Sequence, residues 1–386
     1  MAVSINTGLV DTADPVSNEL KIDMREKIAM LDPDVSQFST MLMKLPQERA
    51  KSFKVEWLND QLLPQVSALS ASSTSTATTL STTADEGSYF KAGDILRIAD
   101  TGEPVRVVAS SASAISVVRA IDGSTAATAA SAAKLIRVGG SNEQGATAPT
   151  AVITKRVAEY NYTQIIRNNY RFTETANATG WYGGPLLAKE RKKKATEHKA
   201  EIENMLFFGA RSYSAGTNNP RHTSGGLLHY VTSESDTDTL DVTELQTFFR
   251  HALEYGSTKK VFFCAPLVAQ VISSFLQQNW IRAQPGENVW GAKVDHIISG
   301  VVGQSIPVVV KKEWKRYGES AGQYGTYGCL VDMEYVQFAP LRDTALLGNR
   351  QANDADEQMA EFISEVSLKV ERPETARWLV DVTGAA

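Results

Sequence analysis

The residue types best suited to chemistry are few in this chain, and their spacing matches no known metal site. The histidines show no His-x-His, His-Glu-x-x-His or mixed Cys/His spacing; they are His198, His222, His229, His251 and His296. We expect each of them to be a surface or packing residue. Cys264 and Cys329 each lie in an apolar, strand-like run, which predicts buried, reduced thiols. The sequence therefore predicts no metal and no cofactor.

Residues that would hold a phosphate or cleave a bond are no better defined. The chain contains no Gly-x-x-x-x-Gly-Lys-Ser/Thr loop. Glycines recur between Gly318 and Gly328 without a strand-turn-helix pattern around them, which indicates a loop. Two converging carboxylates could hydrolyse a glycan, but the 44 acidic residues cannot be paired across a fold from sequence alone. We therefore predict no enzyme and no catalytic residue, and a glycan hydrolase is the weakest of three hypotheses.

A basic run offers binding chemistry. Its members, which we take as candidate intersubunit or interior-facing contacts, are Arg191, Lys192, Lys193 and Lys194. Glu197, Glu201 and Glu203 follow it, so the charge order is opposite to the one that a helix dipole favours. The net charge of −5 argues against a strongly basic nucleic-acid binder. Three interpretations stay open: a solvated face, acidic groups of neighbouring chains, or weak and non-specific contact with nucleic acid.

One long helix must position this basic run. The stretch from Gly184 to Gly209 has Pro185 at the expected first helical position and Gly209 as a left-handed stop. Apolar or packing residues recur on one stripe at helical spacing; they are Leu187, Ala195, His198, Ile202 and Met205. The sequence thus predicts a helix over 185–208 with one packed face.

A second set of candidate contacts lies on two segments with the period of a β-strand. Alternation begins at Lys51, and a matching segment runs from Lys155 to Thr173. Together they predict a long two-stranded ribbon with mixed faces. We expect its aromatic residues to lack cover from their own chain and to contact neighbouring copies; they are Phe53, Trp57, Tyr160 and Tyr162.

The segment between the two ribbon strands has a composition of its own. Residues 62–148 are rich in Ser, Thr, Ala, Val and Gly, and 70–84 alone would indicate a linker. Short apolar runs punctuated by glycine predict a small β module; the runs are Asp94–Ile98, Val105–Val108, Ile115–Arg119 and Lys134–Val138.

The remaining chain predicts an α+β protein. Residues 1–50 read as an arm with little core and two short helices, Asn18–Leu31 and Val35–Lys44. Helix and strand patterns alternate after residue 230, and the last hundred residues are rich in strands. No basic segment followed by an apolar run begins the chain, and no stretch of 18 apolar residues occurs. We therefore expect no membrane contact and synthesis in a cytoplasm.

The order of these parts, with several short motifs, resembles the major capsid proteins of tailed bacteriophages, which have the Hong Kong 97-type fold. The motifs that carry the resemblance are Gly93–Ile98, Tyr160–Arg167, Ala188–Gly209 and Pro220–Leu228. The resemblance implies an N-arm, an E-loop, a P-domain with a spine helix, and an A-domain. The boundaries are 1–50 for the N-arm, 51–173 for the E-loop with its 62–148 β insertion, 174–229 for the P-domain with spine helix 185–208, 230–330 for the A-domain and 331–386 for closing P-domain strands.

The resemblance also implies a function. The chain would self-assemble into hexamers and pentamers of an icosahedral head around double-stranded DNA, located in the virion and, during assembly, in the host cytoplasm. Its implied partners are copies of itself, a portal, scaffolding and decoration proteins, and DNA through weak contacts. No long charged helical stretch precedes the arm, which implies a separate scaffolding protein or none. The alternative is a tail or baseplate protein whose β module binds carbohydrate.

Overall fold

The computed structural model divides the chain into two compact units. One contains Met1–Trp57 and Tyr160–Ala386, and the other contains Leu58–Glu159. The structure describes residues 36–145, 147, 151–180, 185–216, 219–236, 239–277, 282–284, 288–289, 292–293, 295–298 and 305–385. The helix predicted at Asn18–Leu31 lies outside these residues.

The long helix of the first unit is α3, Leu186–Phe208. Pro185 is its N-cap residue, one position earlier than predicted. Gly209 ends the helix, but at φ −58° it is not left-handed as predicted. Glycine is needed there for space instead, because a Cβ would lie 2.4 Å from the Ser224 carbonyl oxygen.

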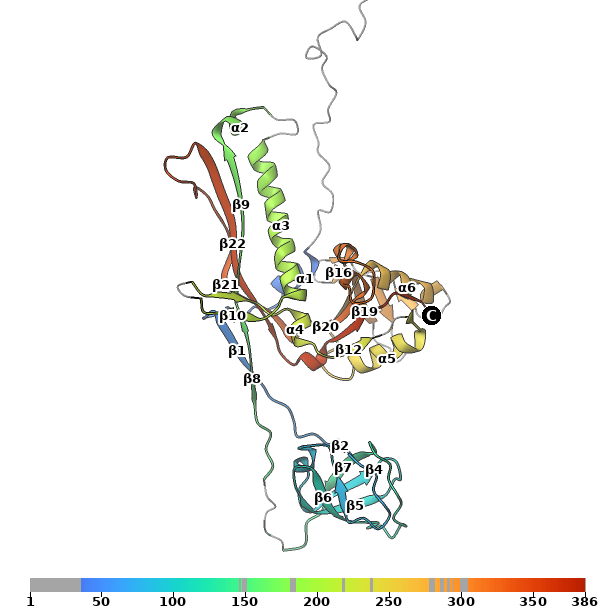
Figure 1. Cartoon of the computed structure of the whole chain (residues 1–386). Coiled ribbons are helices and arrows are strands. Elements are labelled where there is room, and N and C mark those ends of the chain that lie inside the picture. Colours follow the sequence, from blue (N-terminus) through green and yellow to red (C-terminus); the bar gives the residue numbers. More distant parts are fainter. Residues whose placement is uncertain are drawn as a thin grey trace, which may run out of the picture. The chain divides into compact units, whose positions relative to one another are not determined.

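A three-stranded antiparallel sheet flanks α3, with the strand order β21-β22-β9 (Figure 1). The strands span Val336–Leu347, Glu357–Val370 and Gln164–Thr173. A separate two-stranded sheet pairs β1, Lys54–Asn59, with β8, Val157–Tyr162. The continuous strand predicted over 155–173 is therefore wrong. It breaks at Thr163, whose hydroxyl donates to Glu365 Oε1 at 2.9 Å, and β9 beyond the break pairs with β22.

The chain after α3 builds a seven-stranded mixed sheet. Its strands, in order, are β12 (Glu234–Asp236), β23 (Arg377–Val380), β20 (Gly328–Asp332), β14 (Lys260–Cys264), β19 (Ser305–Val310), β18 (Asp295–Ile298) and β15 (Arg282–Gln284). The strands predicted to close one domain over 331–386 thus divide between two sheets, because β23 pairs with β20 and β12. Two helices belong to this region, α5 (Val242–Ala252) and α6 (Pro266–Gln277). Asp241 and Glu244 form a capping box at the start of α5.

The last part of the N-terminal arm joins this core. Helix α1, Gln37–Lys44, buries Phe38, Met41 and Leu42 almost completely. The Phe38 ring lies 4.6 Å from Phe207 of α3 and 5.0 Å from Phe263 of β14, centroid to centroid. The prediction that residues 1–50 have little core is therefore wrong for this helix.

Several short elements complete the first unit. They are α2 (Glu174–Ala178), β10 (Ser212–Ser214), β11 (Arg221–Thr223), α4 (Leu227–Tyr230), β13 (Thr239–Leu240), β16 (Asn288–Val289), β17 (Ala292–Lys293) and β24 (Gly384–Ala385). Short 3-10 helices occur at Lys312–Tyr317, Tyr324–Thr326 and Pro373–Thr375.

The second unit is a six-stranded antiparallel sheet with a hydrophobic core of its own. Its strands, in order, are β2 (Val66–Ala68), β7 (Lys134–Gly140), β4 (Asp94–Ile98), β5 (Pro104–Ser110), β6 (Ala114–Val118) and β3 (Thr79–Ser81). The four runs predicted as strands are all present. The 70–84 stretch contains β3 and is thus part of the sheet.

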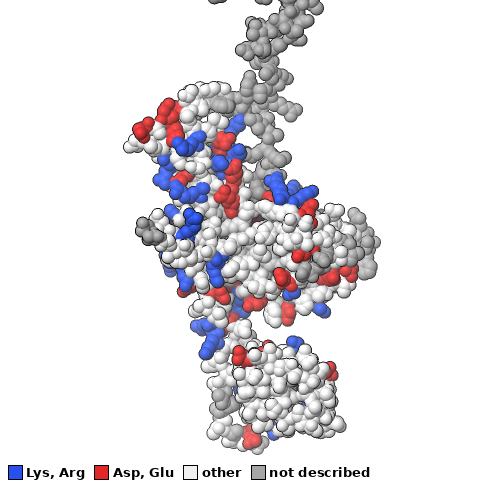
Figure 2. All heavy atoms as spheres, in the orientation of Figure 1, with Lys and Arg blue, Asp and Glu red and all other residues white. Residues whose placement is uncertain are grey.

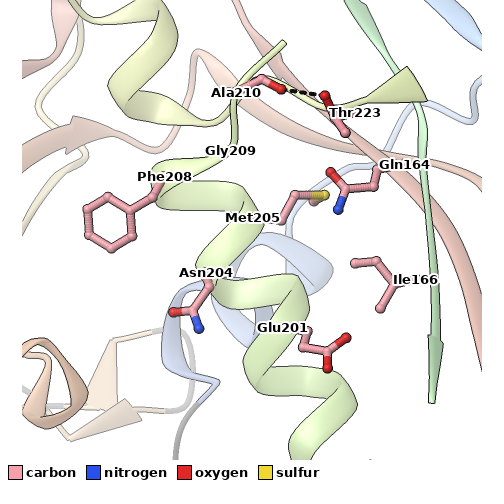
Figure 3. A pocket seen from close by; sticks show the side chains of 9 residues that line it. All are labelled: Gln164, Ile166, Glu201, Asn204, Met205, Phe208, Gly209, Ala210 and Thr223. Atoms are coloured by element: carbon pink, nitrogen blue, oxygen red, sulfur yellow. Dashed lines mark hydrogen bonds between the residues drawn. The ribbon is translucent and has the colours of Figure 1, made fainter. Parts of the chain in front are cut away.

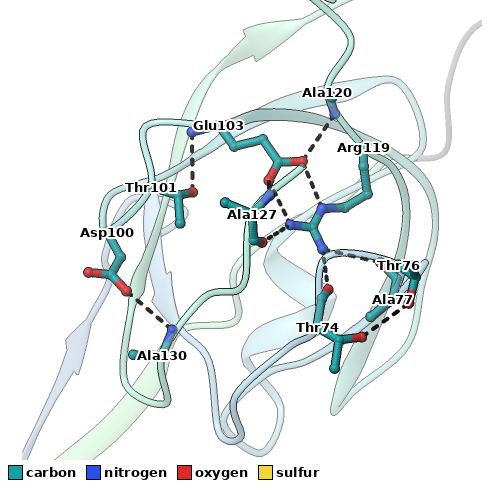
Figure 4. A network of polar contacts seen from close by, with 10 residues as sticks. All are labelled: Thr74, Thr76, Ala77, Asp100, Thr101, Glu103, Arg119, Ala120, Ala127 and Ala130. Atoms are coloured by element: carbon teal, nitrogen blue, oxygen red, sulfur yellow. Dashed lines mark hydrogen bonds and ion pairs between the residues drawn. The ribbon is translucent and has the colours of Figure 1, made fainter. Parts of the chain in front are cut away.

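A buried ion pair fixes the loops of this second unit. Glu103 and Arg119 pair through atoms 2.6 Å apart, with side chains 2% and 8% exposed. Arg119 also donates to the carbonyl oxygens of Thr74 and Ala127, and Glu103 accepts the N–H groups of Ala120 and Ala127 (Figure 4). These contacts satisfy both charges inside the unit.

Candidate assembly surfaces

The basic run lies on the first half of α3, where the side chains reach solvent. Arg191, Lys192 and Lys193 are exposed, and Lys194 is half-buried. Lys194 Nζ lies 2.5 Å from Glu197 Oε2, and Lys193 Nζ lies 4.0 Å from Glu197 Oε1. The hydrogen bond that Lys194 donates to Glu197 raises the pKa of Lys194. Basic and acidic side chains are interleaved around this part of the surface (Figure 2).

Glu197 therefore changes the interpretation of the basic run. The sequence places the basic and acidic residues in different halves of this helix, but two lysines reach one carboxylate one turn away. Arg191 and Lys192 remain exposed on the surface that the structure describes.

The aromatic residues of the predicted ribbon divide into exposed and buried members. Phe53 is 44% exposed and lies 6.2 Å from Tyr162, 6.0 Å from Tyr213 and 5.7 Å from His222, between ring centroids. Trp57, in contrast, is only 6% exposed and packs 5.8 Å from Tyr230. The prediction that Trp57 lacks cover from its own chain is thus wrong, because α4 brings Tyr230 against it.

Tyr160 is likewise held by its own chain. The charged ends of Lys54 and Arg211 lie 4.4 and 4.2 Å from its ring centroid. Its carbonyl oxygen accepts hydrogen bonds from Arg211 Nη1 and from the Tyr230 hydroxyl, both at 2.8 Å. We call Phe53, Tyr162, Tyr213 and His222 the aromatic patch, since these are the rings that stack around Phe53.

The sequence missed half of this patch. Tyr213 and His222 come from strands β10 and β11, which pair directly with each other. Polar residues and glycines dominate 210–229, and only the alternation Ser212-Tyr-Ser214 indicates a strand there.

An open groove of about 450 Å³ runs beside the second half of α3 (Figure 3). Both polar and apolar residues line the groove; they are Gln164, Ile166, Glu201, Asn204, Met205, Phe208, Gly209, Ala210 and Thr223. Glu201 accepts a hydrogen bond from Asn168 Nδ2 at 2.8 Å, and Asn204 accepts one from the Tyr317 hydroxyl at 2.8 Å. The groove has no cluster of groups that would cleave a bond.

The sheet beside α3 carries carboxylates on β22 that pair with arginines. Glu361 is 2% exposed and lies 2.5 Å from Arg167 Nη2 and 2.8 Å from Arg350 Nη2. The hydrogen bond from Arg167 lowers the pKa of Glu361 despite its burial. Glu365 pairs with Arg342 in the same way at 2.7 Å. These acidic residues are therefore ion-pair partners that hold the strands together.

His198 is a packing residue, as the sequence predicts. It is 1% exposed, and its Nε2 lies 2.6 Å from Ser364 Oγ while its Nδ1 contacts Asn168 Oδ1. Burial lowers its pKa, which favours the neutral ring. The side chain thus links α3 to both β22 and β9.

The remaining candidates for chemistry have structural positions. Cys264 and Cys329 are free and buried, and burial raises the pKa of the Cys264 thiol to about 12. Ser320 stands in Gly318-Glu-Ser-Ala-Gly322, a spacing found at nucleophilic serines, but it lies between two 3-10 helices and not on a strand-to-helix turn.

No group of three or more His, Cys, Asp or Glu side chains in the described part of the chain could hold a metal ion. Within those same residues, no helix has both the length and the apolar character needed to cross a membrane.

Comparisons with known proteins identify the family. The SU10 major capsid protein family matches residues 5–383. A major capsid protein of Pseudomonas phage PaMx41 is 28% identical over 180 residues, which is 42% of this chain and 43% of that protein. The match thus spans less than half the length of this curated relative.

A solved structure of low sequence identity shows the fold. The capsid of a native GTA particle matches 97% of this chain and 98% of its own, at 8% identity and a TM-score of 0.50. The capsid of Myoviridae phage XM1 matches 98% of this chain and 100% of its own, at 9% identity and a TM-score of 0.49. The predicted α+β, Hong Kong 97-type fold is confirmed. This chain belongs to the SU10 major capsid protein family.

Proposed function

We propose that this chain forms the icosahedral head of a tailed phage by assembling into hexamers and pentamers around double-stranded DNA. The observation that carries the proposal is the family match over nearly the whole chain, residues 5–383. A capsid subunit needs surfaces that neighbouring copies complete. The described chain offers a two-stranded ribbon, a half-exposed aromatic patch and a charged helix face.

Within this proposal the parts keep the roles that the resemblance implies. Residues 1–50 act as the N-arm, although its last helix is fixed in the core, and 51–173 carry the E-loop with the β insertion at 62–148. Residues 174–229 with α3 form the P-domain, 230–330 the A-domain and 331–386 the closing strands. The structure favours one change, which is to place β20 and β23 with the A-domain sheet.

The proposed partners follow from the surfaces. Copies of this chain come first, through the aromatic patch and the face of α3. A portal, scaffolding proteins and decoration proteins are proposed as further partners. Contact with packaged DNA is proposed to be weak, because the chain has a net charge of −5 and two of its four clustered cations already pair with Glu197.

Sedimentation of the purified full chain tests this function. We expect species much larger than the 42.0 kDa subunit, either shells or capsomers, and we expect their formation to depend on salt. A single 42.0 kDa species at every protein and salt concentration would contradict the proposal.

A further inference from the structure

We propose that one face of α3 is a self-complementary contact that binds the same face of a second copy in antiparallel orientation. This inference rests on the proposed capsid function and names a surface through which two copies meet. It starts from a row of charged side chains spaced by three or four residues. The row consists of Lys193, Lys194, Glu197 and Glu201.

This row has the spacing of a helix-packing seam, and its charged side chains contact one another and Asn168 of β9. Alternating steps of four and three residues let two helices lie side by side at a small crossing angle. None of these four side chains is fully buried, and Lys193 and Glu201 are exposed. The core-facing residues His198, Ile202 and Met205 lie on a different stripe. The seam is thus available to a partner.

The order of charges on the seam selects the antiparallel orientation. Lysines occupy its first half at positions 193 and 194, and Glu201 follows in the second half. Two parallel helices in register would place like charges opposite each other. Two antiparallel helices that cross at Glu197 place Lys193 of each copy opposite Glu201 of the other, so the same ion pair forms twice.

The crossing point and the groove both fit this arrangement. The two Glu197 carboxylates would approach each other, but each already pairs with Lys193 and Lys194 of its own helix, so four ammonium groups surround two carboxylates. The groove next to Glu201 has Ile166, Met205 and Phe208 on its lining (Figure 3). It can take the aliphatic stem of a lysine while the ammonium group reaches the carboxylate.

The antiparallel arrangement also explains the order of charges along α3, which does not stabilise a single helix. The first turn of α3 contains no acidic residue and the last turn contains no basic residue, which is unfavourable for the helix dipole. An antiparallel partner sets the basic half of each helix beside the acidic half of the other and opposes the two dipoles. The unfavourable charge order of the isolated chain then becomes favourable in the pair.

Cysteine crosslinking in assembled particles tests the orientation. At the expected crossing, Glu197→Cys should crosslink to itself, and Lys193→Cys should crosslink to Glu201→Cys when the two variants are mixed and mildly oxidised. Lys193→Cys alone should not crosslink, because eight residues of helix, roughly 12 Å, separate the two copies of that position. Lys199→Cys, exposed on another face of α3, is the matched control and should stay unlinked. Cys264 and Cys329 are buried and should not contribute.

Charge reversal gives a second readout. Lys193→Glu and Glu201→Lys should each reduce the yield of particles by about tenfold or more at low salt, because like charges then face each other. The double variant should recover most of the yield, and Lys199→Glu should have little effect. Thermal melting of unassembled subunits checks that each variant still folds.

The outcomes separate this inference from the function on which it rests. Particles that form normally but show no Glu197→Cys crosslink, or a crosslink of Lys193→Cys with itself, would overturn the antiparallel contact and leave the capsid function standing. The antiparallel contact would also be overturned if residues 1–35 or a scaffolding protein covered the seam. Crosslinks to those partners would then replace the expected ones. Failure of the unmodified chain to assemble under any condition would instead remove the proposed function, and this inference with it.

Discussion

Lys311 Nζ lies 2.7 Å from Glu203 Oε1, in a position where the two side chains are only 1% and 3% exposed. Glu203 also accepts the backbone N–H groups of Phe38 and Ser39 at 2.8 and 2.7 Å. Helix α1 has no side-chain cap from Ser36, so a glutamate of α3 performs that role from 165 residues away. One buried carboxylate thus joins α1, α3 and the segment after β19.

Removing one charge of this pair should destabilise the subunit strongly. Lys311→Met leaves the buried Glu203 carboxylate without its cation, and we expect a loss of about 3–5 kcal/mol in the free energy of unfolding. Glu203→Gln should cost less, because Glu313 Oε2 still lies 3.7 Å from Lys311 Nζ. The double variant Glu203→Gln/Lys311→Met should lose less than the sum of the two single changes. Urea denaturation of unassembled subunits measures all three. A loss below ~1 kcal/mol for both single variants would show that the pair is not needed.

Two truncations should have different effects. Deleting residues 1–45 removes α1 with its buried Phe38, Met41 and Leu42, and should lower the melting temperature of the subunit sharply. Deleting residues 1–35 spares α1 and should leave melting unchanged while it impairs assembly. Melting curves and sedimentation of both variants test this. Equal melting temperatures for the two truncations would mean that α1 adds nothing to the core.

Stability should fall below neutral pH in part through His198. Burial lowers the folded-state pKa of His198, so the unfolded chain binds its proton first as the pH falls. The stability contributed by the neutral ring is complete above the unfolded pKa of about 6.5 and is lost progressively below it. Melting temperatures from pH 8 to pH 5 should therefore drop less for His198→Gln than for the unmodified chain. The exposed His251→Gln is the control, and identical slopes in all three proteins would exclude this role.

The β insertion should fold without the rest of the chain. Its core residues form a cluster separate from the main core, and its strands pair only with one another in the described residues. A fragment of residues 58–159 should melt cooperatively, and Glu103→Gln should destabilise it by about 3–5 kcal/mol because Arg119 loses its partner. Replacing 62–148 by a short Gly-containing turn should leave melting of the remaining subunit cooperative. Loss of that cooperativity would show that the two units fold together.

Local signals made several elements predictable from the sequence. Pro185 and Gly209 bracket α3 to within one residue, and the Asp241–Glu244 spacing marks the start of α5. The glycine-punctuated runs locate β4 to β7. In each case the residues that determine the element lie within it or a few positions away. The sequence pattern alone is therefore enough to predict such an element.

The larger errors concern partners that are distant in the sequence. Tyr230 covers Trp57, and Arg167 meets Glu361, although 194 residues separate the latter pair. The break at Thr163 depends on Glu365, and the docking of α1 depends on Glu203 and Lys311. Periodicity tells which face of an element is apolar, but it does not tell which element covers that face.

A negatively stained micrograph of the purified full chain tests most directly whether this chain builds a closed phage shell, as proposed above. We predict closed shells of uniform diameter, or separate rings with six-fold and five-fold symmetry where shells do not close. A field of small, separate particles the size of the 42.0 kDa subunit, under conditions in which the protein is folded, would contradict the claim.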